Sequence, residues 1–257
     1  MADSTDSTKK QENQEWYRDF GYDMCPERRR APKHGFWDVV KERKFFKLNN
    51  TVTCERNVVR AIKENPVVKL LIAALKEAGC PVDLRRNFAC ETCESSVTGG
   101  YDQELNQIVV CHNQSKSRSN PDVTLVHELI HMYDHCVGEV NFKNIEHLAC
   151  SEIRAANIAH CSFLSSFFLA QSSFFNIKKT HQDCVKFKAA QSMMLARDIS
   201  LEDALSIISK VFDKCYNDLE PVGRRLRRNS LDAQLAYNEA IHLGFCKPLP
   251  GDNPDYY

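Results

Sequence analysis

The sequence predicts an α+β fold that is mostly helical, with a small β-sheet preceding one helix that carries two histidines. Three observations support this class. Apolar residues recur at helical spacing through much of the chain after residue 54. Short segments of β type lie between residues 82 and 112. The stretch HELIHMYDHC, residues 127–136, follows them on a segment with helical periodicity.

Residues 1–53 are predicted to be an N-terminal extension that is partly disordered. Its first 15 residues are polar, and the rest mixes aromatic side chains with charge runs such as ERRR at 27–30. The N-terminus has neither an apolar secretory segment nor the acid-poor composition of a mitochondrial presequence. We therefore expect neither a cleavable secretory signal peptide nor a cleavable mitochondrial presequence.

The first regular elements are expected after this extension. Residues 54–79 should form two helices, because Pro66 suits the first turn of the second helix and Gly79 suits its C-terminal stop. Gly99 and Gly100 are interpreted as a turn between strands. The expected strands are VDLR (82–85), FACE (88–91) and LNQIVVCH (105–112).

The next helix is predicted to begin at Asn120 and Pro121, an N-cap residue and a first-turn residue. Its apolar stripe lies about 110° around the helix from the face that His127 and His131 share. The stripe can therefore pack on a core while the histidines face something else. Its members are Val126, Ile130, Tyr133 and Val137.

His127, Glu128 and His131 form the H-E-x-x-H pattern. Two histidines one helical turn apart can hold the same ion, which indicates zinc with His127 and His131 as metal ligands. Zinc polarises a peptide carbonyl and lowers the pKa of water, and Glu128 would be the catalytic residue that moves the proton. The alternative is a pair of histidines on an amphipathic helix that binds no metal.

Glu152 is the predicted third metal ligand. It lies in NIEHLACSEIRAAN, residues 144–157, which is expected to be a separate helix that packs back on the first. A carboxylate from a second helix completes the His₂Glu class of zinc site. His147, Asp134 and His135 remain alternatives. Asp134 also suits a hydrogen bond to the second ring nitrogen of a ligand histidine.

Further helices are expected to about residue 217, with a helix start at Ser200. The apolar stretch at residues 158–177 contains a histidine, a glutamine and several serines, so it is interpreted as a core or interfacial segment. Residues 54–223 should form the main domain. Residues 224–257 should form a C-terminal tail with one helix.

Twelve cysteines favour disulfide bonds and an oxidising compartment. Cys90 and Cys93, in CETC, are each predicted to take part in a disulfide, with the partner left open, because no second C-x-x-C is present for a metal site. The helical half should hold long-range disulfides with the pairing left open, drawn from Cys136, Cys150, Cys161, Cys184, Cys215 and Cys246. The 34 basic and 34 acidic residues balance, so no nucleic-acid partner is expected.

Three segments together resemble one family: HELIHMYDHC, HLACSEIRAANI (147–158) and CYNDLEP (215–221). The sequence is similar to the mitochondrial inner-membrane metalloprotease family that processes an ATP synthase subunit, some members of which carry the name Ku-binding protein. The likeness covers roughly residues 54–223. It implies that His127 and His131 are metal ligands and that Glu128 is catalytic.

The resemblance also implies a location and a substrate. The protein would be peripheral to the mitochondrial inner membrane on the intermembrane-space side, and oxidative folding would retain it there. Its protein substrate would be the precursor of an ATP synthase Fo subunit, from which it removes the N-terminal presegment, and it would assist Fo assembly.

Two hypotheses follow from the sequence. The first is a zinc-dependent metalloendopeptidase with a zincin-like domain at residues 54–223. The second is a non-proteolytic assembly chaperone or binding protein with a vestigial or structural metal site. Neither hypothesis predicts an oligomeric state or a cleavage site.

Overall fold

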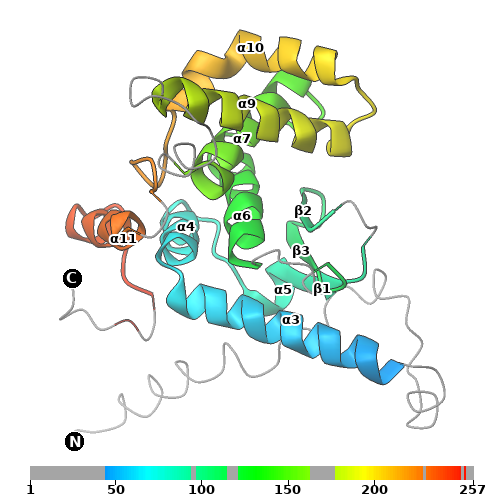
Figure 1. The fold of residues 1–257 in the computed structure, drawn as a ribbon. Helices are drawn as coiled ribbons and strands as arrows, with labels where there is room; N and C mark the ends of the chain where they lie inside the picture. The colour runs from blue at the N-terminus through cyan, green and yellow to red at the C-terminus, as the bar shows by residue number, and fades with distance from the viewer. Residues whose placement is uncertain are drawn as a thin grey trace, which may run out of the picture.

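The structure is a computed structural model that describes residues 44–93, 97–114, 121–162, 177–227, 230–249 and 252. Helix α6 (Pro121–Val137) lies in the middle of the molecule, between a small sheet on one side and α4 on the other (Figure 1). The predicted class is confirmed: the described chain is mostly helical, and its three-stranded sheet precedes the helix that carries the two histidines.

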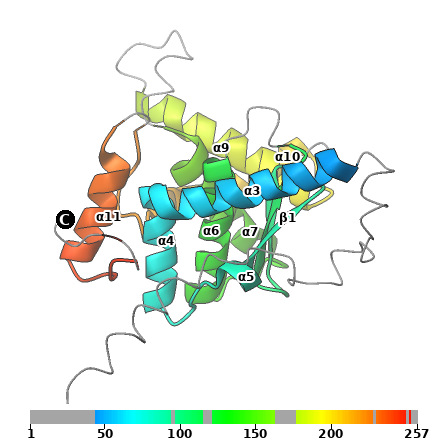
Figure 2. The same cartoon turned by 90° about the horizontal axis from the view of Figure 1, so that it is seen from below.

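Helices α3 (Lys44–Glu64) and α4 (Pro66–Glu77) are the predicted N-terminal pair, although α3 begins earlier than residue 54. Asn65 separates them, and its Oδ1 accepts hydrogen bonds from the first backbone N–H groups of α4. Gly79 ends α4 with a φ of 86°, which favours glycine. Seen from below, α3 crosses α4 and α6 (Figure 2).

The sheet has strands β1 (Phe88–Glu91), β2 (Gly99–Asp102) and β3 (Gln107–Cys111) in the order β1-β3-β2. Strand β1 is parallel to β3, and β2 is antiparallel to it. The strand predicted at 82–85 is wrong. Asp83 instead caps the short helix α5 (Leu84–Asn87), because its Oδ1 accepts from Arg85 N at 2.8 Å.

The turn predicted at Gly99 and Gly100 is also wrong, because both residues lie in β2. Packing gives the reason. A Cβ atom on Gly99 would lie 2.4 Å from Thr124 Cγ2 on α6 and 2.8 Å from the Val109 carbonyl oxygen. Glycine therefore lets the backbone of β2 lie directly against α6, a demand that local sequence does not reveal.

Helices α7 (Ile145–Ala155), α9 (Ile177–Ala196) and α10 (Leu201–Asn217) pack together above α6 in Figure 1, and the π-helix η1 (Ala156–His160) follows α7. They enclose a second hydrophobic core. Ser200 begins α10 as predicted, since its Oγ accepts from Asp203 N. Buried members of this core include Ile153, Met193, Ile208 and Phe212.

The stripe predicted on α6 is only partly correct. Val126 and Ile130 are buried, whereas Tyr133 is half-buried and Val137 is 44% exposed. From Thr124 to Met132 the helix is buried on every face, because α4, the sheet and α7 surround it. The predicted N-cap Asn120 lies outside the described residues.

Helix α11 (Asp232–His242) is the helix expected after residue 223. It packs on α4 and contributes Ala236, Tyr237 and Ala240 to a hydrophobic core that also holds buried residues of α3, α4, α6 and the sheet, so it is fixed to the body of the protein (Figure 1). The domain boundaries at residues 54 and 223 remain predictions. Residues 163–176 of the apolar stretch lie outside the described part. None of the described helices has the length and apolar character needed to span a membrane.

Ten cysteines form disulfides within the described residues, and the predicted disulfide roles of Cys90 and Cys93 are confirmed. The prediction that Cys246 forms a long-range disulfide is wrong, because Cys246 is a buried free thiol. The pairs are Cys54–Cys90, Cys80–Cys136, Cys93–Cys111, Cys150–Cys215 and Cys161–Cys184.

The Cys150–Cys215 disulfide joins α7 to α10 and closes the longest of these loops, with a sequence separation of 65. Replacing both cysteines by alanine should lower the free energy of unfolding by about 4 kcal/mol, because the unfolded chain regains the entropy of that loop. Guanidinium unfolding measures the change. Cys246→Ala is the control for losing a buried sulfur alone, and an unchanged midpoint in the double variant would contradict the prediction.

Candidate metal centre

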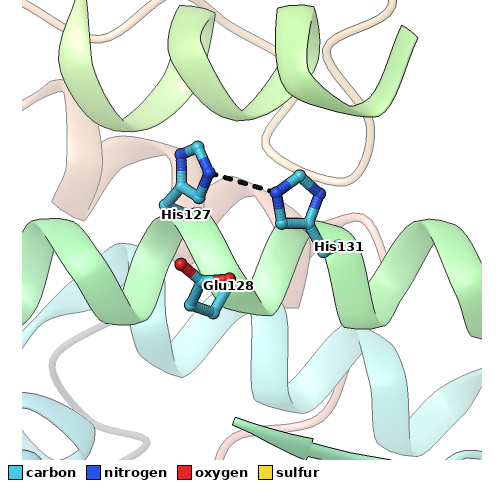
Figure 3. Close-up of side chains that lie close together, drawn as sticks. All are labelled: His127, Glu128 and His131. Atoms are coloured by element: carbon cyan, nitrogen blue, oxygen red, sulfur yellow. Dashed lines mark hydrogen bonds between the residues drawn. The ribbon is translucent and has the colours of Figure 1, made fainter. Parts of the chain in front are cut away.

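His127 and His131 lie one turn apart on α6, and both are buried, with exposed fractions of 8% and 7%. Their imidazoles project from the same side of the helix, and the two Nε2 atoms are 3.1 Å apart (Figure 3). The periodicity of the helix is enough to bring them together. The predicted pair therefore points two nitrogen lone pairs at one place.

Glu152 reaches the same place from α7, as the sequence predicted for a carboxylate from a second helix. Its Oε2 lies 3.3 Å from His127 Nε2, and its Oε1 lies 3.5 Å from His131 Nε2. The side chain is buried, with 3% of the residue exposed. Asn144 sets the start of α7, because its Oδ1 accepts from the backbone N–H groups of Glu146 and His147.

The spacing of these donors fits a divalent metal ion. Two donors bound at about 2.0–2.1 Å to a tetrahedral ion stand roughly 3.3 Å apart. The observed separations are 3.1 Å between the two histidine nitrogens and 3.3 and 3.5 Å from them to the Glu152 oxygens. Glu152 Oε2 also has no well-oriented hydrogen-bond donor among the described residues, despite its burial. A cation between the three side chains would satisfy that oxygen.

Glu128 lies beside the histidine pair on the neighbouring face of α6 (Figure 3). One ligating atom from each of His127, Glu128 and His131 lies within 4.8 Å of the others, so Glu128 is a second carboxylate within reach. Its carboxylate also accepts a hydrogen bond from the backbone N–H of Tyr101 in β2. Glu152 contacts both ring nitrogens, which leaves Glu128 available for a different task.

The charges of the cluster are distributed unevenly in the absence of an ion. Burial opposes protonation of His127, but the close contact with Glu152 and the charges of Glu128 and Glu152 outweigh it and raise the pKa of His127 to about 9. Burial lowers the pKa of His131 to about 4. Burial also opposes ionisation of Glu152, but His131 and His127 outweigh it and lower the pKa of Glu152 to about 2.

Glu128 differs from Glu152 in this respect. Burial raises the pKa of Glu128 to about 7, and the repulsion from Glu152 adds to it, while His127 and the Tyr101 N–H act in the other direction. In the metal-free protein the surroundings thus shift the pKa values of the two buried carboxylates in opposite directions.

A buried hydrogen-bond network holds the Nδ1 side of the His131 ring. Ser151 Oγ–H donates to Asp134 Oδ2 at 2.7 Å, so its oxygen accepts from His131 Nδ1–H, also at 2.7 Å. Arg154 contacts the other oxygen of Asp134 at 3.1 Å and is paired with Asp218. The direct contact predicted between Asp134 and a ligand imidazole is therefore corrected: Ser151, which the sequence analysis missed, lies between them.

If the cluster holds a metal ion, Ser151→Ala should weaken metal binding about 10–100-fold, which is the usual effect of losing a hydrogen bond that orients a metal ligand. The substitution frees the imidazole of His131 to rotate and leaves Asp134 without its donor. Competition with a chromophoric chelator measures the affinity. Ser209→Ala on the exposed face of α10 is the matched control. Equal affinities in the two variants would show that Ser151 does not orient His131.

The remaining alternatives for the third ligand are not brought to the cluster. His147 is exposed, and its Nδ1 accepts from Asn141 N at 3.3 Å. His135 lies one turn further along α6, where its ring is near Phe142 and its Nδ1 contacts the Val140 carbonyl oxygen. His160 does lie next to the cluster, with its Nε2 3.1 Å from His127 Nδ1. The sequence analysis missed it, because its position depends on the π-helix that ends at this residue.

A cavity of about 850 Å³ opens over the cluster. Strand β2 and the turn that follows it line one side, and the second half of α9 lines the other, including Lys188, Ser192 and Leu195. His127, Glu128, His131 and Glu152 lie at its floor. The volume lies within the range of ligand-binding clefts, so the cluster is accessible to a bound substrate.

Comparison with known proteins supports this interpretation. The model of the peptidase M76 family matches residues 52–223. A relative from Danio rerio, named mitochondrial inner membrane protease ATP23 homolog, is 40% identical over 225 residues, covering 86% of this chain and 84% of its own. The human protein of that name is 39% identical over 210 residues, covering 81% of each chain.

A more distant relative is the mitochondrial inner membrane protease atp23 of Schizosaccharomyces pombe, which is 35% identical over 173 residues, or 65% of this chain and 90% of its own. No solved structure matches the chain. The resemblance found in the sequence is confirmed by the family match, which spans both the histidine pair on α6 and Glu152 on α7. The chain belongs to the peptidase M76 family.

Proposed function

We propose that this peptidase is a zinc-dependent endopeptidase in which His127, His131 and Glu152 hold the ion and Glu128 is the catalytic residue. One observation supports this assignment above all. Donor atoms of three buried side chains from α6 and α7 stand at the separations of a tetrahedral metal site, and a second carboxylate lies beside them. The ligands N, N and O favour zinc, the usual ion of His₂Glu sites.

The protein's own groups account for the proton transfers. Zinc, when bound, supplies a Lewis acid that polarises the peptide carbonyl and makes water acidic. The Glu128 carboxylate takes a proton from the attacking water and passes it to the nitrogen of the leaving amine. The Tyr101 N–H holds this carboxylate in place, and Ser151 and Asp134 hold the His131 ring.

Strand β2 is suited to bind the substrate backbone. Cys111 N donates to Thr98 O, so the hydrogen-bonded pairs of this antiparallel ladder recur at Gly100 and Asp102. The backbone groups of Gly99 and Tyr101 therefore point away from β3, and the Tyr101 N–H indeed meets Glu128. An extended peptide can pair with this outer edge and place a carbonyl over the cluster.

The location and the substrate are proposed from the family resemblance and from the relatives' names. We propose that the protein works peripherally at the mitochondrial inner membrane, on the intermembrane-space side. Disulfides persist in oxidising compartments, and those in the described chain support such a location. The proposed substrate is the precursor of an ATP synthase Fo subunit, which loses its N-terminal presegment, and the protein would also assist Fo assembly.

The test uses the full-length protein, loaded with zinc and incubated with the purified precursor. We expect mass spectrometry to detect one shortened product with a new N-terminus. Removal of the metal by a chelator should stop cleavage, and added zinc should restore it. Cleavage that persists without metal would refute the metallopeptidase. Binding of the precursor without any cleavage would support the assembly chaperone instead.

A further inference from the structure

His160 is the last residue of the π-helix η1, and it points back at the metal centre. Its Nε2 lies 3.1 Å from His127 Nδ1, and the centroids of the two rings are 5.0 Å apart. π-helical turns are rare and are frequent at functional sites, where they change the direction of one side chain. Here the wider turn brings a histidine from beyond the end of α7 to the cluster on α6.

The positions of the protons follow from the contacts of His127. Its Nε2 faces His131 Nε2 at 3.1 Å and Glu152 Oε2 at 3.3 Å, so this nitrogen must present its lone pair when an ion is held. The ring proton then resides on Nδ1 and is donated to His160 Nε2. Because Nδ1 and Nε2 point to different sides of the ring, His160 faces away from the ion's position and is not a fourth ligand in this arrangement.

The backbone next to His160 is held rigidly. Cys161 N donates to Ala156 O at 2.9 Å, and Cys161 is bonded to Cys184 of α9 by a disulfide. The Cys161 carbonyl oxygen accepts from His181 Nε2 at 2.8 Å. His181 is fully buried, and its Nδ1 accepts from the Tyr216 hydroxyl on α10 at 2.9 Å. Contacts with α9 and α10 thus fix the segment that carries His160, which is what accurate positioning of a side chain requires.

We propose that His160 is a positioning residue that selects the Nδ1-protonated tautomer of His127 and fixes the orientation of its ring for metal binding. This inference rests on the proposed function. The two ligand histidines would then be oriented by different hydrogen-bond partners. His131 is held by Ser151 and Asp134, whereas His127 is held by a second imidazole that also lines the cavity. The two sets of contacts share no residue, so each can be removed separately.

Two substitutions distinguish a hydrogen-bond role from a packing role. His160→Phe keeps a ring of similar size but removes the acceptor, whereas His160→Gln retains an amide oxygen that can reach His127 Nδ1. We expect His160→Phe to weaken zinc binding about 10–100-fold and His160→Gln to remain within about threefold of the wild type. The d–d absorption of the cobalt-substituted protein should change in His160→Phe alone. Matched controls are His242→Phe and His242→Gln, at an exposed position of α11.

Chelator competition, cobalt spectra and thermal unfolding of the full-length protein decide among the outcomes. Wild-type affinity and spectrum in His160→Phe would overturn the inference. Equal losses in both variants, accompanied by a lower melting temperature, would also overturn it, because packing alone would then explain the effect. Absence of metal binding in the wild type would refute the proposed function itself, which is a different result from a wild-type-like His160→Phe variant.

Discussion

Glu128→Gln should abolish peptide cleavage while leaving the metal affinity close to that of the wild type. The amide cannot accept the proton of the attacking water, so we expect the rate of cleavage to fall about 10²–10⁴-fold. Glutamine has nearly the same shape and is uncharged, which suits a buried position whose carboxyl group has a pKa raised to about 7 by burial. The fold should therefore persist. Cleavage rates and zinc content of the same preparations measure the two expectations.

A matched control for this variant is Glu146→Gln, which makes the same chemical change at an exposed position in the first turn of α7. It should cleave at the wild-type rate. Unchanged cleavage by Glu128→Gln with zinc still bound would show that another group moves the proton, and our assignment would fail. If Fo assembly continues while cleavage stops, the protein has a second, non-proteolytic role.

Glu152→Ala should lose the metal and the activity together. It removes the carboxylate that lies within 3.5 Å of both ring nitrogens. Loss of a residue that only orients a ligand weakens metal binding by up to roughly 100-fold, and we expect the loss of Glu152 to weaken zinc binding more than that. In the metal-free protein the pKa of His127 should fall below its value of about 9, because the contact with the Glu152 carboxylate is one of the interactions that raise it. Chelator competition and histidine NMR measure these changes.

Glu152→Asp provides the comparison, since it keeps the charge but shortens the side chain. It should retain partial affinity if Glu152 is a ligand, whereas Glu152→Ala should retain little. Wild-type zinc content in Glu152→Ala would exclude Glu152 from the ligand set and would point to Glu128 as the carboxylate that completes the site.

Much of the site could be predicted because its chemistry is local. His127 and His131 are brought together by one turn of one helix, so their spacing in sequence determines their spacing in space. Glu128 follows from the same helix. Predicting Glu152 required the further assumption that a second helix packs back on the first. That assumption was reasonable because catalytic zinc sites often combine two histidines with one glutamate. The structure places Glu152 against both histidines.

Other features depend on contacts between distant segments, and local patterns predicted them wrongly or not at all. Gly99 resembles a turn residue, yet it lies in a strand because α6 allows no Cβ there. Ser151 lies beside Glu152 in sequence, but its role is visible only once Asp134 and His131 surround it. His160 reaches His127 only because the backbone takes a π-helical turn.

The sequence by itself thus determined the class of the fold and the cluster of two histidines with a carboxylate beside them, because helical periodicity operates within one element. Only the tertiary structure decided which cysteines pair, how β2 lies against α6, and which groups hold the two imidazoles from behind. Those outcomes depend on the packing of α6 against α7, η1 and the sheet, and packing between elements depends on shape and burial that no short stretch of sequence contains.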